Sequence, residues 1–181
     1  GPAFRFNEAV SLQVFCDTWG WAFAWIEIGP SVTAAAGNNA PVILEPSADL
    51  AAAAAKIAVG GYAFAGQSCI SVQRAYVHRS IHDEFVASLA EKVAALKVGD
   101  PMDPATNVSA LISSKETERV AAWLDEAVGD GAGIVTGGDR AEHGVLRPTL
   151  VDRVTPTMKI SNTEVFGPVV GVTAYDTFDE A

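Results

Sequence analysis

Residues 41–78 read PVILEPSADLAAAAAKIAVGGYAFAGQSCISVQRAYVH, and their pattern is the strongest indication of the fold class. It begins with a short continuous apolar run at 41–45, of the kind that is buried in a parallel sheet. An alanine-rich segment follows, which Ser47 or Asp49 can cap and which favours a helix. The β-branched and aromatic run at 74–78 predicts a second strand. A strand, a helix and a strand in this order indicate an α/β fold.

The remainder of the chain continues the alternation. An apolar stripe spaced by three and four residues predicts a helix that begins near Ser80 and Asp83, which resemble a capping box. The stripe consists of Ile81, Phe85, Leu89, Val93 and Leu96. Ser113 and Glu116 predict a second capping box, with a helix to about Val128. Further strands are expected near 133–136, 147–151 and 169–175, which gives an open sheet with flanking helices.

Composition excludes several classes of partner. The chain has 181 residues, 49% of them apolar, which suffices for one buried core. Its net charge is −10 and it has no basic cluster, so neither nucleic acid nor an anionic membrane is an expected partner. Two cysteines are too few for a disulfide framework, and the amino end does not have the pattern of a secretion signal. We therefore expect a cytoplasmic protein.

Residues 1–36 form an apolar and aromatic segment without an assigned role. The stretch 9–28 is the most apolar part, but Gln13, Asp17 and Glu27 interrupt it. A membrane-spanning helix needs about 18 or more residues with few or no charges. We therefore expect a buried or interface segment.

Cys69 lies in a turn of small residues between the alanine-rich segment and the strand at 74–78. Gly66 and Ser68 beside it allow a ligand to approach the backbone. Such a cysteine is either a nucleophile or an inert buried thiol.

The three histidines lack the spacing of metal ligands, so we expect no metal site. The sequence also has no glycine-rich phosphate-binding loop.

The segment 64–74, FAGQSCISVQR, resembles the active-site cysteine motif of the NAD(P)-dependent aldehyde dehydrogenases. Further segments resemble that family in the same order along the chain: GNNAPVIL at 37–44, SADL at 47–50, AYVH at 75–78, DEF at 83–85, KVGDP at 97–101, GG at 137–138, RPTL at 147–150 and EVFGPV at 164–169. Residues 37–181 are therefore interpreted as part of an aldehyde dehydrogenase catalytic domain.

The resemblance implies roles for three residues. Cys69 corresponds to the nucleophile, which attacks an aldehyde and then carries a thioester. Glu164 corresponds to the glutamate that accepts hydrogen bonds from the nicotinamide ribose, and Phe166 to a wall of the coenzyme site. NAD or NADP is the implied cofactor, a small-molecule aldehyde the substrate, and a homo-oligomer the expected state of the full-length protein.

The position of the general base is where this sequence departs from the family pattern. Counting back from Asn38 places Ala34 where the family has its glutamate, and alanine cannot activate water. Glu27 lies in a similar Glu-Ile-Gly pattern seven residues earlier. We therefore name Glu27 as the candidate base, against the alternative of an acidic residue at the end of a strand.

The family has a separate coenzyme domain before the cysteine and a further stretch after the Phe-Gly-Pro motif, so these residues are interpreted as a partial domain. Two alternatives remain: an interaction or assembly module, and a thiol esterase. We expect the isolated chain to bind NAD weakly and not to turn over aldehyde.

Residues 70–74, which follow Cys69, resemble branches of the family that act on small oxygenated aldehydes. The particular aldehyde and the choice of NAD or NADP stay open.

Overall fold

The computed structural model describes residues 3–7, 10–16, 22–28, 40–141 and 144–181, and for the first three of these segments it describes the backbone. The elements are β1 Ala3–Asn7, β2 Val10–Cys16, β3 Ala22–Ile28, β4 Ala40–Leu44, α1 Leu50–Tyr62, η1 Ala63–Gly66, β5 Val72–His78, η2 Arg79–Ile81, α2 His82–Ala94, α3 Ser114–Gly129, β6 Gly133–Thr136, β7 Thr149–Asp152, α4 Lys159–Asn162 and β8 Val169–Tyr175. They confirm the expected alternation of strands and helices.

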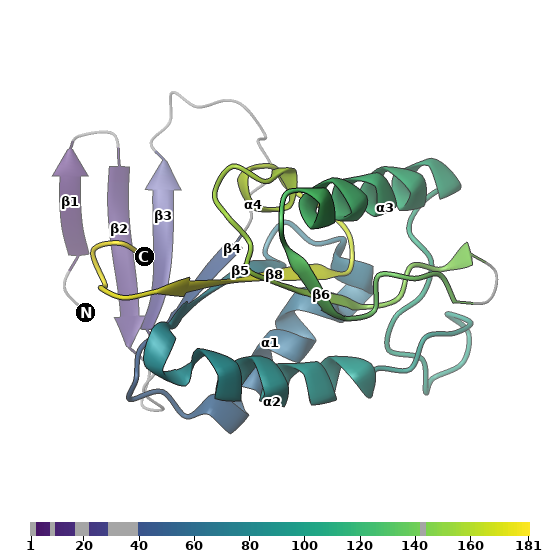
Figure 1. Cartoon of the computed structure of the whole chain (residues 1–181), viewed down its shortest axis with the longest axis horizontal. Helices are drawn as coiled ribbons and strands as arrows, with labels where there is room; N and C mark the ends of the chain where they lie inside the picture. The colour runs from purple at the N-terminus through teal and green to yellow at the C-terminus, as the bar shows by residue number, and fades with distance from the viewer. Residues whose placement is uncertain (1–2, 8–9, 17–21, 29–39, 142–143) are drawn as a thin grey trace.

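A five-stranded sheet in the order β4-β5-β8-β7-β6 is the centre of the fold. The first four strands in this order are parallel, and β6 pairs antiparallel with β7 at the edge. Figure 1 shows α1 and α2 on one face of the sheet and α3 and α4 on the other. The expected α/β fold, an open sheet with flanking helices, is confirmed.

The apolar stripe of α2 packs into the core as expected. Phe85, Leu89 and Val93 are buried, while Ile81 and Leu96 are partly buried against the same core. Beside α2, on the same face of the sheet, α1 buries Ile57 and Tyr62. The phenol of Tyr62 donates to the main-chain oxygen of Thr149 at 2.9 Å, which ties α1 to the start of β7.

Two of the three predicted helix caps are confirmed. Asp49 accepts from the Ala52 amide at 3.0 Å at the start of α1, and Ser113 accepts from the Glu116 amide at 3.3 Å at the start of α3. The capping box at Ser80 is wrong. A 3-10 turn precedes α2, its N-cap is Ile81, and the Ser80 amide donates to Nδ1 of His78.

The amino-terminal segment forms an antiparallel sheet in the order β1-β2-β3. The backbones of Ser11 and Glu27 are paired between β2 and β3, so Glu27 is the penultimate residue of β3. No helix within the described residues is long and apolar enough to cross a membrane.

We expect Leu89→Ala to lower the free energy of unfolding by about 2–5 kcal/mol, because it leaves a cavity between α2 and the sheet. Val59→Ala is the matched control: its side chain is 69% exposed on α1, and its removal should change stability by about 0.5 kcal/mol or less. Urea denaturation of both variants measures the difference. Equal midpoints would contradict the assignment of this core.

Candidate active site

The candidate site lies where two loops enter neighbouring parallel strands. Strands β5 and β8 are paired in parallel, with Arg74 opposite Gly171. The turn that contains Cys69 directly precedes β5, and the loop at 163–168 directly precedes β8. Because parallel strands have their amino ends at the same edge, the topology brings both loops to one edge of the sheet.

Cys69 is exposed at the tip of a tight turn. The Ser71 amide donates to the Ser68 main-chain oxygen at 2.9 Å, so Cys69 and Ile70 are the two central residues of the turn. The Ser71 hydroxyl donates to the Gly61 main-chain oxygen at 3.1 Å and anchors the turn to α1. Both central residues are exposed, and the thiol is free. The turn therefore leaves Cys69 accessible from solvent.

Gln67 holds the approach to this turn, a role the sequence did not indicate. Its side-chain amide donates to the Phe64 main-chain oxygen at 3.2 Å and accepts from the Ile112 amide at 2.9 Å. The side chain therefore links the segment before Cys69 to the segment before α3. A glutamine in a run of small residues is a weak signal, because its partner lies 45 residues away along the chain.

The segment before Gln67 has a constrained backbone. Phe64, Ala65 and Gly66 have positive φ values of 53°, 57° and 69°. A left-handed conformation at a non-glycine residue costs about 1–2 kcal/mol, so the surrounding contacts must hold it.

Gly66 brings the two loops into direct contact. A Cβ atom there would lie 2.0 Å from the main-chain oxygen of Gly167 and 3.1 Å from the nitrogen of Pro168. Only glycine allows this approach of the two backbones. The contact holds the loop at 163–168 against Gly66, which lies three positions before Cys69 in the sequence.

Glu164 carries a carboxylate with one oxygen shielded from solvent. Its Oε1 has no hydrogen-bond partner among the described residues. Burial raises the pKa of this carboxyl above its ordinary value, and the charge of Arg119 opposes the rise. A shielded acceptor without a donor fits a ligand that brings hydroxyl groups.

Phe166 also lies in this loop. Its φ is 48°, and its side chain is 37% exposed. The structure thus brings together three of the predicted site residues, Cys69, Glu164 and Phe166, at one edge of the sheet.

Glu27 is not brought to this edge by the described residues. It lies in the three-stranded sheet, and its side chain is outside the described part of the structure. Residues 29–39, which include Ala34 and join β3 to β4, also lie outside the described residues. The assignment of the base stays a prediction.

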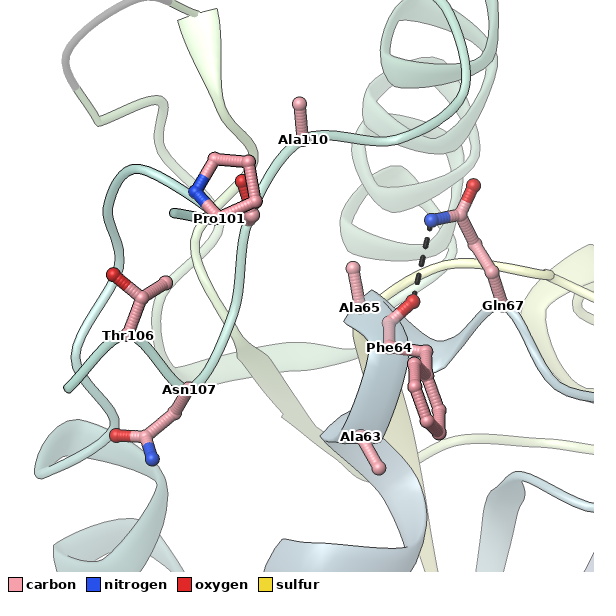
Figure 2. A pocket seen from close by; sticks show the side chains of 9 residues that line it. Ala63, Phe64, Ala65, Gln67, Pro101, Thr106, Asn107 and Ala110 are labelled. Atoms are coloured by element: carbon pink, nitrogen blue, oxygen red, sulfur yellow. Dashed lines mark hydrogen bonds between the residues drawn. The ribbon is translucent and has the colours of Figure 1, made fainter. Parts of the chain in front are cut away.

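A pocket of about 600 Å³ lies beside the cysteine turn. Figure 2 shows Phe64, Ala65 and Gln67 on one side of it and Pro101, Thr106 and Asn107 on the other. Its full lining is Ala63, Phe64, Ala65, Gln67, Pro101, Thr106, Asn107, Ser109 and Ala110. Cys69 is not among these residues, so the pocket adjoins the reactive turn without containing the thiol.

His78 and His82 both make side-chain hydrogen bonds, and His143 lies outside the described residues. His78 pairs with Ser80 through Nδ1 at 2.9 Å, and His82 contacts Asp83 and Asp152 at 2.8 and 2.9 Å. Within the described residues, no group of three or more His, Cys, Asp or Glu side chains could hold a metal ion.

Comparison with known proteins identifies the family. The profile of the aldehyde dehydrogenase family matches residues 27–181, a range that begins at Glu27. The 3-sulfolactaldehyde dehydrogenase of Priestia aryabhattai is 46% identical over 144 residues, which cover 80% of this chain and 30% of that protein.

Solved structures agree. The Mycobacterium tuberculosis aldehyde dehydrogenase complexed with NAD+ matches with a TM-score of 0.76 and 37% identity over 79% of this chain and 30% of that one. The NADP-dependent glyceraldehyde-3-phosphate dehydrogenase of Bacillus halodurans, complexed with NADP, matches with a TM-score of 0.76 and 33% identity. This match covers 80% of this chain and 30% of that one.

The chain belongs to the aldehyde dehydrogenase family. It spans about 30% of the length of these relatives.

We expect Gly66→Ala to destabilise the protein by about 1–3 kcal/mol or more, because alanine would be strained at this φ and its Cβ would collide with Gly167. Gly129→Ala is the control: its Cβ would meet nothing within 4 Å, so we expect a gain of at most about 1 kcal/mol. Thermal and urea unfolding measure both variants. A Gly66→Ala protein as stable as the unaltered one would contradict the backbone contact.

Proposed function

We propose that the whole protein oxidises an aldehyde to a carboxylic acid with NAD+ or NADP+, with Cys69 as the nucleophile. The observation that supports this most strongly is the exposed thiol beside a loop that carries a shielded, unpartnered carboxylate oxygen. Membership of the family supports the reaction class.

The first step is addition of the Cys69 thiolate to the carbonyl carbon. A C–S bond forms, and the π electrons of the carbonyl move to its oxygen, which becomes an oxyanion. Among the described residues the Cys69 amide donates to no protein acceptor, so it is a candidate donor to this oxyanion.

Collapse of the oxyanion restores the C=O bond and expels hydride with both electrons of the C–H bond, which leaves a thioester on Cys69. The nicotinamide ring of the coenzyme, when bound, would supply the acceptor for this hydride. Water then adds to the thioester carbon, the C–S bond breaks, and the sulfur recovers its proton as the acid leaves. A base that activates this water accelerates the last step, and Glu27 is the proposed base.

Glu164 and Phe166 would hold the coenzyme near the thiol. The free Oε1 of Glu164 suits a ribose hydroxyl, because an ionised carboxylate only accepts hydrogen bonds. Phe166 supplies an apolar wall next to it.

These 181 residues give only part of the coenzyme site. Relatives complexed with NAD+ and with NADP are both about three times longer than the matched region. We therefore propose that the isolated chain binds the coenzyme weakly and does not turn over aldehyde.

The substrate class we propose is a small oxygenated aldehyde. The relative with 46% identity is a 3-sulfolactaldehyde dehydrogenase, and a lactaldehyde dehydrogenase of Methanococcus aeolicus is 33% identical. Both names describe short aldehydes with polar substituents, in agreement with the resemblance of residues 70–74.

In the whole polypeptide, Cys69→Ser should lower NADH formation by roughly 10³-fold or more, because the weak serine nucleophile replaces the thiol. Cleavage of p-nitrophenyl acetate should fall with it. Cys16→Ser is the matched control and should retain both activities. NADH formation unchanged in Cys69→Ser would exclude Cys69 as the nucleophile.

Glu27→Gln should slow thioester hydrolysis by about 10²–10⁴-fold, because glutamine cannot accept the proton of water. Rapid mixing should still show a first burst of NADH, since hydride leaves before water attacks. Glu91→Gln, an exposed carboxylate on α2, is the control. A steady-state rate equal to that of the unaltered enzyme would assign the base elsewhere.

A further inference from the structure

Val165 is held on both sides of its backbone. Its amide donates to Oε1 of Gln73 at 2.9 Å, and its main-chain oxygen accepts from the guanidinium of Arg119 at 2.7 Å. Its side chain is fully buried in the core. Glu164 and Phe166 are its immediate neighbours, so both extend from a residue that is fixed at three points.

Gln73 provides the first of these contacts from an unusual position. It lies on β5, four residues after Cys69, and is 1% exposed. Its Nε2 has no partner among the described residues. Because an unsatisfied buried amide group is costly, an apolar residue would suit this part of the core better unless the contact with Val165 has a role.

Arg119, which lies on α3, provides the second contact. Its Nε donates to Glu116 at 2.7 Å, and its guanidinium lies 4.6 Å from the centre of the Trp123 ring. These contacts leave the group little freedom, so the hydrogen bond to Val165 joins the loop to a rigid part of α3.

We propose that Gln73 and Arg119 are positioning residues that clamp Val165 and thereby fix Glu164 and Phe166 relative to Cys69. Gln73 holds Val165 in a fixed position relative to β5, the strand that follows the proposed nucleophile. Arg119 holds Val165 in a fixed position relative to α3. The inference rests on the proposed function and adds to it the residues that place the ribose-binding carboxylate.

The clamp matters for hydride transfer because that step needs the coenzyme and the aldehyde to be held in a fixed position relative to each other. The coenzyme must lie against the carbon that is bonded to Cys69, and a misplacement of about 1 Å can cost roughly 10²-fold in rate. Attack of the thiol on an ester needs no coenzyme. Loss of the clamp should therefore reduce NADH formation more than it reduces ester cleavage.

The first experiment compares these two activities in the whole polypeptide. For Gln73→Met we expect the ratio of NADH formation to p-nitrophenyl acetate cleavage to fall by about tenfold or more. The isotope effect for aldehyde deuterated on its carbonyl carbon should rise, because hydride transfer becomes slower. Gln73→Glu keeps an oxygen that accepts from Val165 and should recover most of the ratio.

Arg119→Met tests the clamp from the opposite side and should lower the same ratio. Arg79→Met is its matched control: Arg79 is exposed and pairs with Asp176 beyond the carboxyl end of β5, about 20 Å along the strand from the cysteine turn. This variant should leave the ratio unchanged.

The second experiment measures the clamp without any coenzyme. Amide hydrogen exchange at Val165 should accelerate by about tenfold or more in Gln73→Met, because its acceptor is removed. Exchange at Leu89 in α2 should not change, which would show that the fold is intact.

The outcomes separate the two proposals. If the unaltered polypeptide forms no NADH, the proposed function fails and this inference fails with it. If it forms NADH while the Gln73→Met and Arg119→Met variants keep the same ratio, only this inference is overturned. Unchanged exchange at Val165 in Gln73→Met would also overturn it.

Discussion

The close approach of Gly66 to the backbone of Gly167 is the contact on which the arrangement of the site depends. A side chain at residue 66 would meet the Gly167 oxygen at 2.0 Å, so the two loops can touch only because none is present. The consequence is chemical, because the thiol and the carboxylate of Glu164 belong to segments almost a hundred residues apart in sequence. Open α/β sheets usually bind ligands at the carboxyl ends of their strands. Here the two loops precede β5 and β8, so the candidate site lies at the amino ends of these strands.

Several features near this contact lower the stability of the site and have no value for packing. Phe64 and Ala65 adopt left-handed backbone conformations, Gln73 leaves a buried amide group unpaired, and Glu164 has a shielded carboxylate oxygen without a donor. The core formed by α1, α2 and the sheet is apolar and continuous, so it can tolerate these local costs. Strain and unsatisfied polar atoms concentrated beside one exposed thiol are typical of a binding or catalytic site.

The sequence was sufficient to predict most local structure, and less of what depends on distant contacts. Apolar periodicity gave the stripe of α2 and the strands at β4 and β8, and the caps at Asp49 and Ser113 follow from short-range chemistry. The cap at Ser80 failed because His78 competes for its amide. The placement of β8 between β5 and β7 could not be deduced, since it joins segments far apart in sequence. Gln67 and Gln73 were missed for the same reason: their partners lie 45 and 92 residues away.

The topology places the candidate site residues on two different sheets. Cys69, the proposed nucleophile, and Glu164, the proposed ribose-binding residue, lie in loops that precede strands of one sheet, whereas Glu27 belongs to another sheet and is joined to the first through residues 29–39. In the proposed reaction, attack on the aldehyde and placement of the coenzyme both depend on geometry within the five-stranded sheet. Hydrolysis of the proposed thioester requires only that a base reach water after hydride has left. A base on the three-stranded sheet is therefore compatible with the proposed chemistry, because this step does not need the geometry of the earlier ones.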